Sequence, residues 1–261
     1  MLTLMETHAE LLKINREMNK ELEKFYQERK ENVKKQNENK YRNLGINFVS
    51  ETLETKYSYN FSWMGRPIIA FPQDMMAMQE IIWDVKPDLI IETGVAHGGS
   101  IVYYASLLEL LGSDGIVVGI DIDIRKHNRD LIESHPMMKR IKLIEGSSID
   151  EKIVNQVKDL AKTKSKILIC FDSNHTHEHV LEELKLYAPL TSIGSYCVVF
   201  DTIVEDMPKE FDWNRPWNKE KNPKTAVWEY LKTNSNFKID HSIQDKLLVT
   251  VAPEGYLKRI K

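Results

Sequence analysis

Polar side chains that could bind a ligand or a cation follow several apolar runs in this 261-residue sequence, at points where buried strands would end. Any one of them could simply cap the helix that follows its strand. In a parallel sheet, however, the carboxyl ends of the strands meet at one edge, so a series of such residues would converge on a single site. The series consists of Glu92, Asp121, Ser147, Ser148, Asp172 and Asp201.

The stretch at residues 89–100 holds the first of these acids together with three glycines. An apolar run ends at Glu92, and Gly94 and Gly98 precede an apolar-periodic segment that starts near Ile101. This order predicts a buried strand, a tight turn and the start of a helix, whose free N–H groups could bind a small polar ligand. The glycines depart from the G-x-G-x-x-G spacing of dinucleotide-binding loops, so a dinucleotide is not expected.

The rest of the chain alternates between apolar runs and amphipathic segments, which is typical of a mostly parallel α/β sheet with helices on both faces. Strands are expected at residues 89–92, 116–121, 141–144, 167–171 and 196–200. Helices are expected at residues 72–85, 101–111, 128–134, 150–161, 177–186 and 225–231. Two further apolar runs, joined by a polar turn, predict an antiparallel pair at one edge of the sheet, at residues 237–239 and 247–251.

Residues 1–56 differ in character and are expected to form a helical extension of a domain at residues 57–261. Apolar residues recur there at steps of three and four, so a charged helix over residues 6–40 would carry one narrow apolar stripe. The stripe comprises Leu11, Ile14, Met18, Leu22 and Phe25. It could pack on the body of the protein or mediate a homo-oligomer. The aromatic residues at 57–63 are consistent with either a loop that folds over a pocket or a strand edge.

The composition indicates which classes of partner and which cellular compartment to expect. A net charge of −3 without a basic patch argues against nucleic acid as a partner. Cys170 and Cys197 each lie within an apolar run, as expected for buried, reduced thiols. The first residues lack the features of a secretory signal, and no apolar run reaches the length of a membrane span. We therefore expect a cytoplasmic protein without a transmembrane segment that acts on a small molecule.

The loop Glu92-x-Gly94-x-x-x-Gly98, with Asp121 at the end of the next strand, resembles the S-adenosyl-L-methionine site of Rossmann-like methyltransferases. Over residues 57–258 the chain resembles one family, that of cephalosporin hydroxylases and rhamnosyl O-methyltransferases. The matching segments are residues 67–73, 89–100, 172–184, 194–202, 215–217 and 222–227. The resemblance implies a three-layer Rossmann-like methyltransferase fold. It also implies methylation of a hydroxyl on a sugar, a glycan or a sugar-containing natural product.

The same resemblance implies roles for individual residues. Glu92 and Gly94 would hold the methionine end of the cofactor, and Gly98 would keep the loop close to it. Asp121 would accept hydrogen bonds from the ribose hydroxyls, and Ser148 would lie beside the adenine. The cofactor site implied in this way comprises Glu92, Thr93, Gly94, Gly98, Ser100, Asp121, Ser148 and Asp172.

Asp172 and Asp201 match positions that bind a divalent cation in this family, with Thr202 as a third oxygen ligand. Oxygen donors of this kind suit Mg²⁺. Phe200 departs from the family pattern, in which a second acid often stands beside the aspartate, so reactions with and without a cation are both retained. His175, shortly after Asp172, is the expected base that removes the proton of the acceptor hydroxyl.

Other functions fit the sequence less well. His175, His177 and His179 come without a cysteine set, which argues against a zinc site. The ligand pattern of a non-haem iron oxygenase is missing from the sequence, which disfavours a hydroxylase or an oxidoreductase. A non-catalytic assembly or regulatory protein that retains the fold is the main alternative. Four further residues could shape an acceptor pocket or form surface ion pairs, namely Arg66, Arg215, Trp217 and Lys224.

Overall fold

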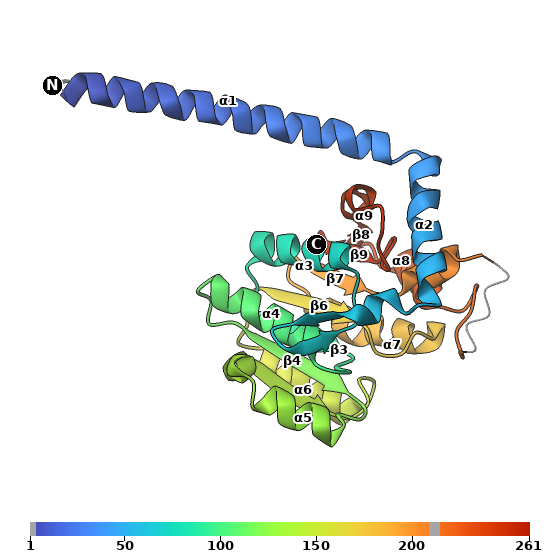
Figure 1. The fold of residues 1–261 in the computed structure, drawn as a ribbon. Helices are drawn as coiled ribbons and strands as arrows, with labels where there is room; N and C mark the ends of the chain where they lie inside the picture. The colour runs from blue at the N-terminus through green and yellow to red at the C-terminus, as the bar shows by residue number, and fades with distance from the viewer. Residues whose placement is uncertain (1–3, 209–214) are drawn as a thin grey trace.

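The computed structural model describes residues 4–208 and 215–261, with side chains from residue 18 onward. Within these ranges the strands form a seven-stranded sheet and a separate two-stranded sheet. Helices cover both faces of the larger sheet, which gives a three-layer α/β sandwich (Figure 1). The predicted fold class, a Rossmann-like sandwich with a mostly parallel sheet and an N-terminal helical extension, is confirmed.

The large sheet has the strand order β5-β4-β3-β6-β7-β9-β8. Its strands are β3 (Leu89–Thr93), β4 (Ile116–Asp121), β5 (Ile141–Glu145), β6 (Ile167–Phe171), β7 (Tyr196–Val199), β8 (Phe237–Ile239) and β9 (Tyr256–Arg259). β3 to β7 run parallel, whereas β9 is antiparallel to both of its neighbours. The carboxyl ends of the parallel strands therefore share one edge of the sheet, where the predicted site residues meet.

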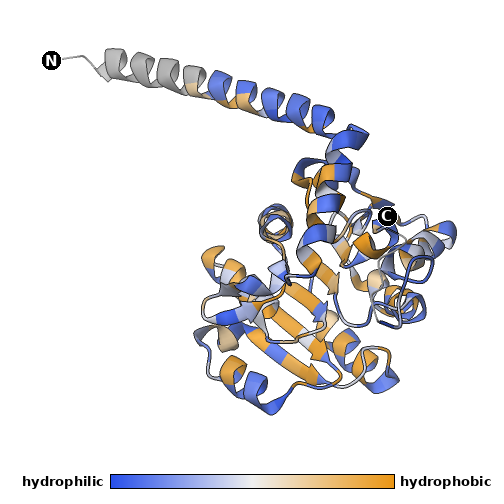
Figure 2. Cartoon of the chain, turned by 45° about the vertical axis from the view of Figure 1, so that its right-hand side comes forward, coloured by the Kyte–Doolittle hydropathy of each residue, from blue (hydrophilic) through white to orange (hydrophobic). Residues whose placement is uncertain are grey.

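Two apolar clusters join the helices to the sheet. The helices on one face are α3 (Pro72–Val85), α4 (Gly99–Leu110) and α5 (Lys126–Glu133). Those on the other face are α6 (Glu151–Ala161), α7 (His177–Tyr187) and α8 (Pro223–Thr233). Because successive strand residues point to opposite faces and helices cover both faces, the central strands are mostly apolar, as the orange colour of much of the sheet in Figure 2 shows. Cys170 and Cys197 are buried free thiols on opposite faces, as predicted.

The prediction that the second strand of the antiparallel pair lies at residues 247–251 is wrong. Residues His241–Leu247 form helix α9, Leu248 adopts a positive φ of 61°, and the sheet strand follows later as β9. β9 lies between β7 and β8, so the edge strand of the sheet is β8.

Asp74 of α3 explains where the misassigned segment goes instead. Its carboxylate accepts hydrogen bonds from the Thr250 hydroxyl and from the Val251 N–H, the latter at 2.9 Å. These bonds hold the segment against the helices, where Val249 and Val251 pack on the cluster around Phe71. The apolar run therefore fills space outside the sheet.

The N-terminal extension consists of α1 (Leu4–Gln36) and α2 (Asn39–Leu53), whereas the sequence predicted a single helix over residues 6–40. α2 lies against the body so closely that a Cβ on Gly45 would stand 1.9 Å from the Leu248 carbonyl oxygen. The second half of α1 contacts α3 and α9, whereas its N-terminal end projects beyond the body (Figure 1). The division of the chain at residue 57 stays a prediction. Across the described residues, no helix is both long enough and apolar enough to cross a membrane.

The aromatic segment before Gly65 forms a strand edge. A short 3-10 helix, η1 (Tyr57–Asn60), leads into the hairpin of β1 (Phe61–Trp63) and β2 (Arg66–Ile68). The Trp63 ring packs edge-on against Tyr103 of α4 at 4.8 Å, and its indole N–H donates to the Ser106 hydroxyl at 2.9 Å. The hairpin is thus fixed on α4, which supports the strand-edge alternative over a mobile lid.

Candidate active site

Glu92 lies near the carboxyl end of β3 and is fully buried. Its Oε2 accepts a hydrogen bond from the Ser100 hydroxyl on α4 at 2.7 Å. Burial raises the pKa of Glu92 to about 8, although hydrogen bonds from Ser100 and Tyr104 oppose the increase, and the charge of Asp121 adds to it. Since a buried carboxyl without a cationic partner holds its proton, this group is mostly neutral at pH 7.

Gly94 and Gly98 allow two close backbone approaches in the loop after β3. Gly94 has a φ of +95°, and a Cβ there would lie 2.0 Å from the carbonyl oxygen of Asp172 on the neighbouring strand end. Gly98, with a φ of +79°, precedes α4, and a Cβ there would meet the Ile132 side chain at 2.4 Å. The loop therefore presents bare backbone and the N terminus of α4, as a polar ligand requires.

Asp121 at the end of β4 orients this loop. Its Oδ2 accepts hydrogen bonds from the N–H groups of Val95 at 2.8 Å and Ala96 at 3.1 Å, while Oδ1 accepts one from Asp123 at 3.1 Å. A carboxylate oxygen can accept more than one hydrogen bond, so Oδ1 keeps capacity for a ribose hydroxyl. The ribose contact itself stays a prediction.

Arg66 supports the loop from behind, which the sequence analysis did not predict. The side chain is 5% exposed, and its Nε donates to the His97 carbonyl at 3.0 Å while Nη2 donates to Oδ1 of Asn128 at 3.1 Å. Asn128 in turn donates to the Ala96 carbonyl at 3.0 Å. Asn128 is a second supporting residue that the sequence reasoning missed, because its partners lie far away along the chain.

Ser148 follows β5 and sits in a buried polar cluster. Its hydroxyl donates to Oε1 of Glu183 at 2.6 Å and lies 3.0 Å from Nε2 of His179. Its placement beside an adenine stays a prediction. Ile122 and Ile149, which directly follow Asp121 and Ser148, are 74% and 40% exposed. Such exposed apolar side chains could cover the face of a base, although sequence reasoning gave them no role.

Asp172, His175 and Asp201 converge at the ends of β6 and β7. One ligand atom from each lies within 4.8 Å of the others, and no other such group of histidine, cysteine or acidic residues occurs in the described ranges. Nε2 of His175 is 3.3 Å from Oδ2 of Asp201, and its ring packs edge-on against Trp217 at 4.8 Å. Asp201 has a φ of 55°, in the left-handed region that few non-glycine residues adopt and in which aspartate is enriched.

The carboxyl groups of Asp172 and Asp201 lie close enough together for a cation to stabilise their ionised forms. Burial, followed by the negative charge of Asp201, raises the pKa of Asp172 well above its usual range. A divalent cation would relieve this repulsion, and two carboxylates with water suit Mg²⁺. The donor set therefore fits the predicted ion, with His175 free to act as a base.

The remaining metal-site predictions involve Thr202 and Phe200. Thr202 is buried, and its hydroxyl donates to the Pro253 carbonyl at 2.7 Å, so its role as a third ligand stays a prediction. Phe200 is 9% exposed and belongs to the apolar cluster on the α3 and α4 face. At the position where the family pattern often has a second acid, this chain therefore has an apolar side chain that packs in the core.

The three nearby histidines diverge. His175 faces Asp201, whereas His177 bridges α7 and α8 by contacting Thr225 at 2.7 Å and Glu229 at 3.1 Å. His179 faces the Ser148 cluster. The three side chains therefore contact different partners.

Lys224 does not line an acceptor pocket. It is 2% exposed and pairs with Asp206 at 2.6 Å and Glu254 at 3.8 Å, so it forms a buried ion-pair network. Arg215 stacks over the Trp217 ring at 5.6 Å, and this ring in turn contacts His175, so both stand at the edge of the cluster. Residues 209–214, which precede Arg215 in the sequence, lie outside the described residues.

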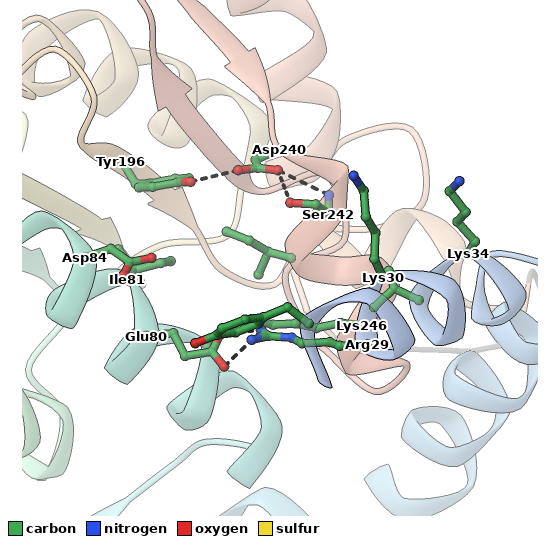
Figure 3. Close-up of a pocket in the computed structure, with 14 residues that line it drawn as sticks. Arg29, Lys30, Lys34, Glu80, Ile81, Asp84, Tyr196, Asp240, Ser242 and Lys246 are labelled. Atoms are coloured by element: carbon green, nitrogen blue, oxygen red, sulfur yellow. Dashed lines mark hydrogen bonds and ion pairs between the residues drawn. The ribbon is translucent and has the colours of Figure 1, made fainter. Parts of the chain in front are cut away.

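A cavity of about 440 Å³ lies elsewhere, between α1, α3 and α9 (Figure 3). Glu80 on its floor pairs with Arg29 of α1 and with Lys246 of α9. Asp240 accepts hydrogen bonds from Tyr196 at 2.7 Å and from Ser242. These contacts join α1 to the body and use none of the residues at the carboxyl edge of the sheet.

A parallel sheet with an inserted antiparallel β9, a glycine loop after β3 and acids at successive strand ends define a Rossmann-like methyltransferase. The chain belongs to the rhamnosyl O-methyltransferase/CmcI family, whose model matches residues 55–260. This match confirms the predicted family and the predicted enzyme class, an S-adenosylmethionine-dependent methyltransferase.

A curated relative supports the family, and two solved structures share the fold. A rhamnosyl O-methyltransferase of Mycobacterium bovis (strain BCG / Pasteur 1173P2) is 31% identical over 218 residues, covering 81% of this chain and 85% of the relative. A CmcI structure with Mg and SAM has a TM-score of 0.57 at 20% identity, covering 78% of each chain. An O-methyltransferase from Bacillus cereus in complex with SAH has a TM-score of 0.51 at 13% identity, covering 86% of this chain and 92% of the other.

Proposed function

We propose that this protein transfers the methyl group of S-adenosyl-L-methionine to a hydroxyl of a sugar or a sugar-containing molecule, with Mg²⁺ assistance. The observation that carries this proposal is the convergence of Asp172, His175 and Asp201 beside the Gly94 loop. The relatives named rhamnosyl O-methyltransferases support a sugar as the acceptor class.

In the proposed reaction the acceptor oxygen attacks the methyl carbon, and the carbon–sulfur bond breaks with its electron pair passing to sulfur. Most of the catalysis comes from alignment, because the sulfonium is already a good leaving group. His175 takes the hydroxyl proton, and Asp201, 3.3 Å away, stabilises the resulting imidazolium. When bound between Asp172 and Asp201, Mg²⁺ would lower the pKa of the acceptor hydroxyl.

A labelling experiment tests the acceptor class. The protein is incubated with methyl-labelled S-adenosylmethionine and a panel of rhamnosides, other glycosides, nucleotide sugars and a catechol, with and without a chelator. We expect label on a sugar hydroxyl and a loss of transfer on chelation. Transfer to the catechol alone would contradict the sugar assignment. Cofactor binding without transfer to any acceptor would favour the non-catalytic alternative.

The pKa of Glu92 predicts how cofactor affinity depends on pH. The cofactor carries a sulfonium and an ammonium charge, and a cation near Glu92 favours its ionised form. Bound protein therefore holds fewer protons than free protein, so affinity should rise with pH up to about 8, where Glu92 ionises unaided. Calorimetry in buffers of different ionisation enthalpy should detect proton release at pH 7.

The control for this experiment is Glu92→Gln, which can still accept the bond from Ser100. We expect no proton release and a flat pH profile for this variant. Equal proton release from both proteins would assign the titration to another group.

We also propose that α1 mediates a homo-oligomer. Met18, Leu22 and Phe25 are 63%, 51% and 59% exposed on a helix that leaves the body. Replacing Leu22 and Phe25 together with aspartate should lower the mass measured by light scattering, because charges would oppose burial of the stripe. Leu110→Asp, at a side chain that is 81% exposed on α4, is the matched control and should leave the mass unchanged. A monomeric wild-type protein would contradict the proposal.

A further inference from the structure

One face of α7 carries three polar side chains that hold the loop after β5. His179, Glu183 and Tyr187 lie four residues apart, so they stack along the helix. The Tyr187 hydroxyl donates to the Ser148 carbonyl at 2.5 Å, while the Ser148 hydroxyl donates to Glu183. Both the backbone and the side chain of Ser148 are therefore tied to α7.

Glu183 also reaches the loop after β6. Its Oε1 accepts the Ser173 hydroxyl at 2.8 Å in addition to the Ser148 hydroxyl at 2.6 Å, and Nε2 of His179 lies 3.4 Å away. Ser173 directly follows Asp172, so a single carboxylate oxygen links the predicted adenine end of the site to the Asp172 cluster. Both hydroxyl distances lie within the range of O–H···O hydrogen bonds.

Packing alone does not account for a glutamate at this position. The side chain is 0% exposed, and its Oε2 is buried without a hydrogen-bond partner in the described part of the chain. A buried carboxyl with an unpaired oxygen is unfavourable, and an apolar residue of similar volume is often tolerated better at such places. The gain from Glu183 must therefore come from the two loops that it fixes.

We propose that Glu183 is a positioning residue that sets the loops of Ser148 and Asp172 in one fixed arrangement for the cofactor. This inference rests on the site roles given under the proposed function. Glu183 itself touches neither cofactor nor acceptor, and it acts through Ser148 and Ser173.

Hydrogen exchange in the ligand-free protein tests the positioning directly. Glu183→Met removes both acceptor contacts, whereas Glu183→Gln keeps an oxygen that can accept both hydroxyls. We expect Glu183→Met to speed exchange about tenfold in residues 146–150 and 172–176, and Glu183→Gln to stay within about threefold of wild type. His177→Ala, which removes another polar anchor of the same helix, should leave both loops unchanged.

Binding of S-adenosylhomocysteine gives the second readout. The dissociation constant should rise about tenfold in Glu183→Met and be rescued in Glu183→Gln. If Glu183 acts through the two serines, Ser148→Ala with Ser173→Ala should reproduce the effect, and adding Glu183→Met to that pair should change the constant little.

The two readouts separate this inference from the proposed function. Slow, wild-type exchange in both loops of Glu183→Met, or equal disruption by Glu183→Gln, would overturn the role of Glu183. Failure of the wild-type protein to bind S-adenosylhomocysteine would instead contradict the proposed function, while the exchange rates would still decide whether Glu183 fixes the loops.

Discussion

Asp172→Asn should lower methyl transfer by about two to four orders of magnitude, the range expected when a group that orients the acceptor and holds a cation is lost. The amide keeps the volume of the side chain but removes the charge that would bind Mg²⁺. The readout is release of S-adenosylhomocysteine in the presence of the sugar acceptor, together with calorimetric titration of Mg²⁺.

The same substitution should not lower the thermal midpoint of the protein. Burial and the charge of Asp201 raise the pKa of Asp172, so its ionised form is unfavourable in the folded protein. An amide relieves that repulsion, and the midpoint should stay equal or increase. A loss of activity at unchanged or higher stability is typical of functional rather than structural residues.

Glu145→Gln is the matched control. Glu145 ends β5 at the same edge of the sheet, but it is exposed and pairs with Arg129 at 2.6 Å. Its loss should leave both transfer and Mg²⁺ binding within about twofold, as expected for a surface ion pair. If Asp172→Asn kept full activity, or lost activity and stability together, the assignment of Asp172 to the reaction would be wrong.

The core of the fold could be predicted because its strands are buried on both faces. Runs such as 89–91 and 167–171 are apolar throughout, and the amphipathic segments between them leave little choice of architecture. The same signal failed at residues 247–251, which have the composition of a strand but pack against α2 and α3. The true strand, β9, contains two basic residues, Lys258 and Arg259, whose side chains reach Tyr196 and the Thr191 carbonyl.

Some residues of the candidate site could likewise be predicted from the sequence, and others could not. Glu92, Asp121, Asp172 and Asp201 could be found because each follows a strand, and strand ends converge in any parallel sheet. Asn128, Glu183 and the supporting role of Arg66 could not, because their contacts join segments far apart in the sequence and depend on how the hairpin, the loop and α7 pack. For Lys224 the sequence left an acceptor pocket and a surface ion pair open, and the structure shows an ion pair with Asp206 that is buried.

Gly94→Ala should abolish cofactor binding and lower the free energy of unfolding by more than about 3 kcal/mol, well above the cost of a positive φ alone. The backbone at Gly94 has a φ of +95°, and the new Cβ would stand 2.0 Å from the carbonyl oxygen of Asp172. Neither partner can yield easily, because the Asp172 N–H is bonded to the Thr93 carbonyl at 2.9 Å and the Gly94 N–H to Ile120 at 2.7 Å. Chemical denaturation and titration with S-adenosylhomocysteine measure the two effects.

Gly112→Ala separates backbone strain from the steric clash. Gly112 has a φ of +63°, but a Cβ there would meet nothing within 4 Å. We expect it to lose about 1 kcal/mol of stability and to bind S-adenosylhomocysteine as the wild type does. Equal losses in the two variants would mean that strain, and not the approach of β3 to β6, explains Gly94. A larger loss at Gly94, with binding gone, would show that the loop and Asp172 form one rigid unit, since a single methyl group would displace both.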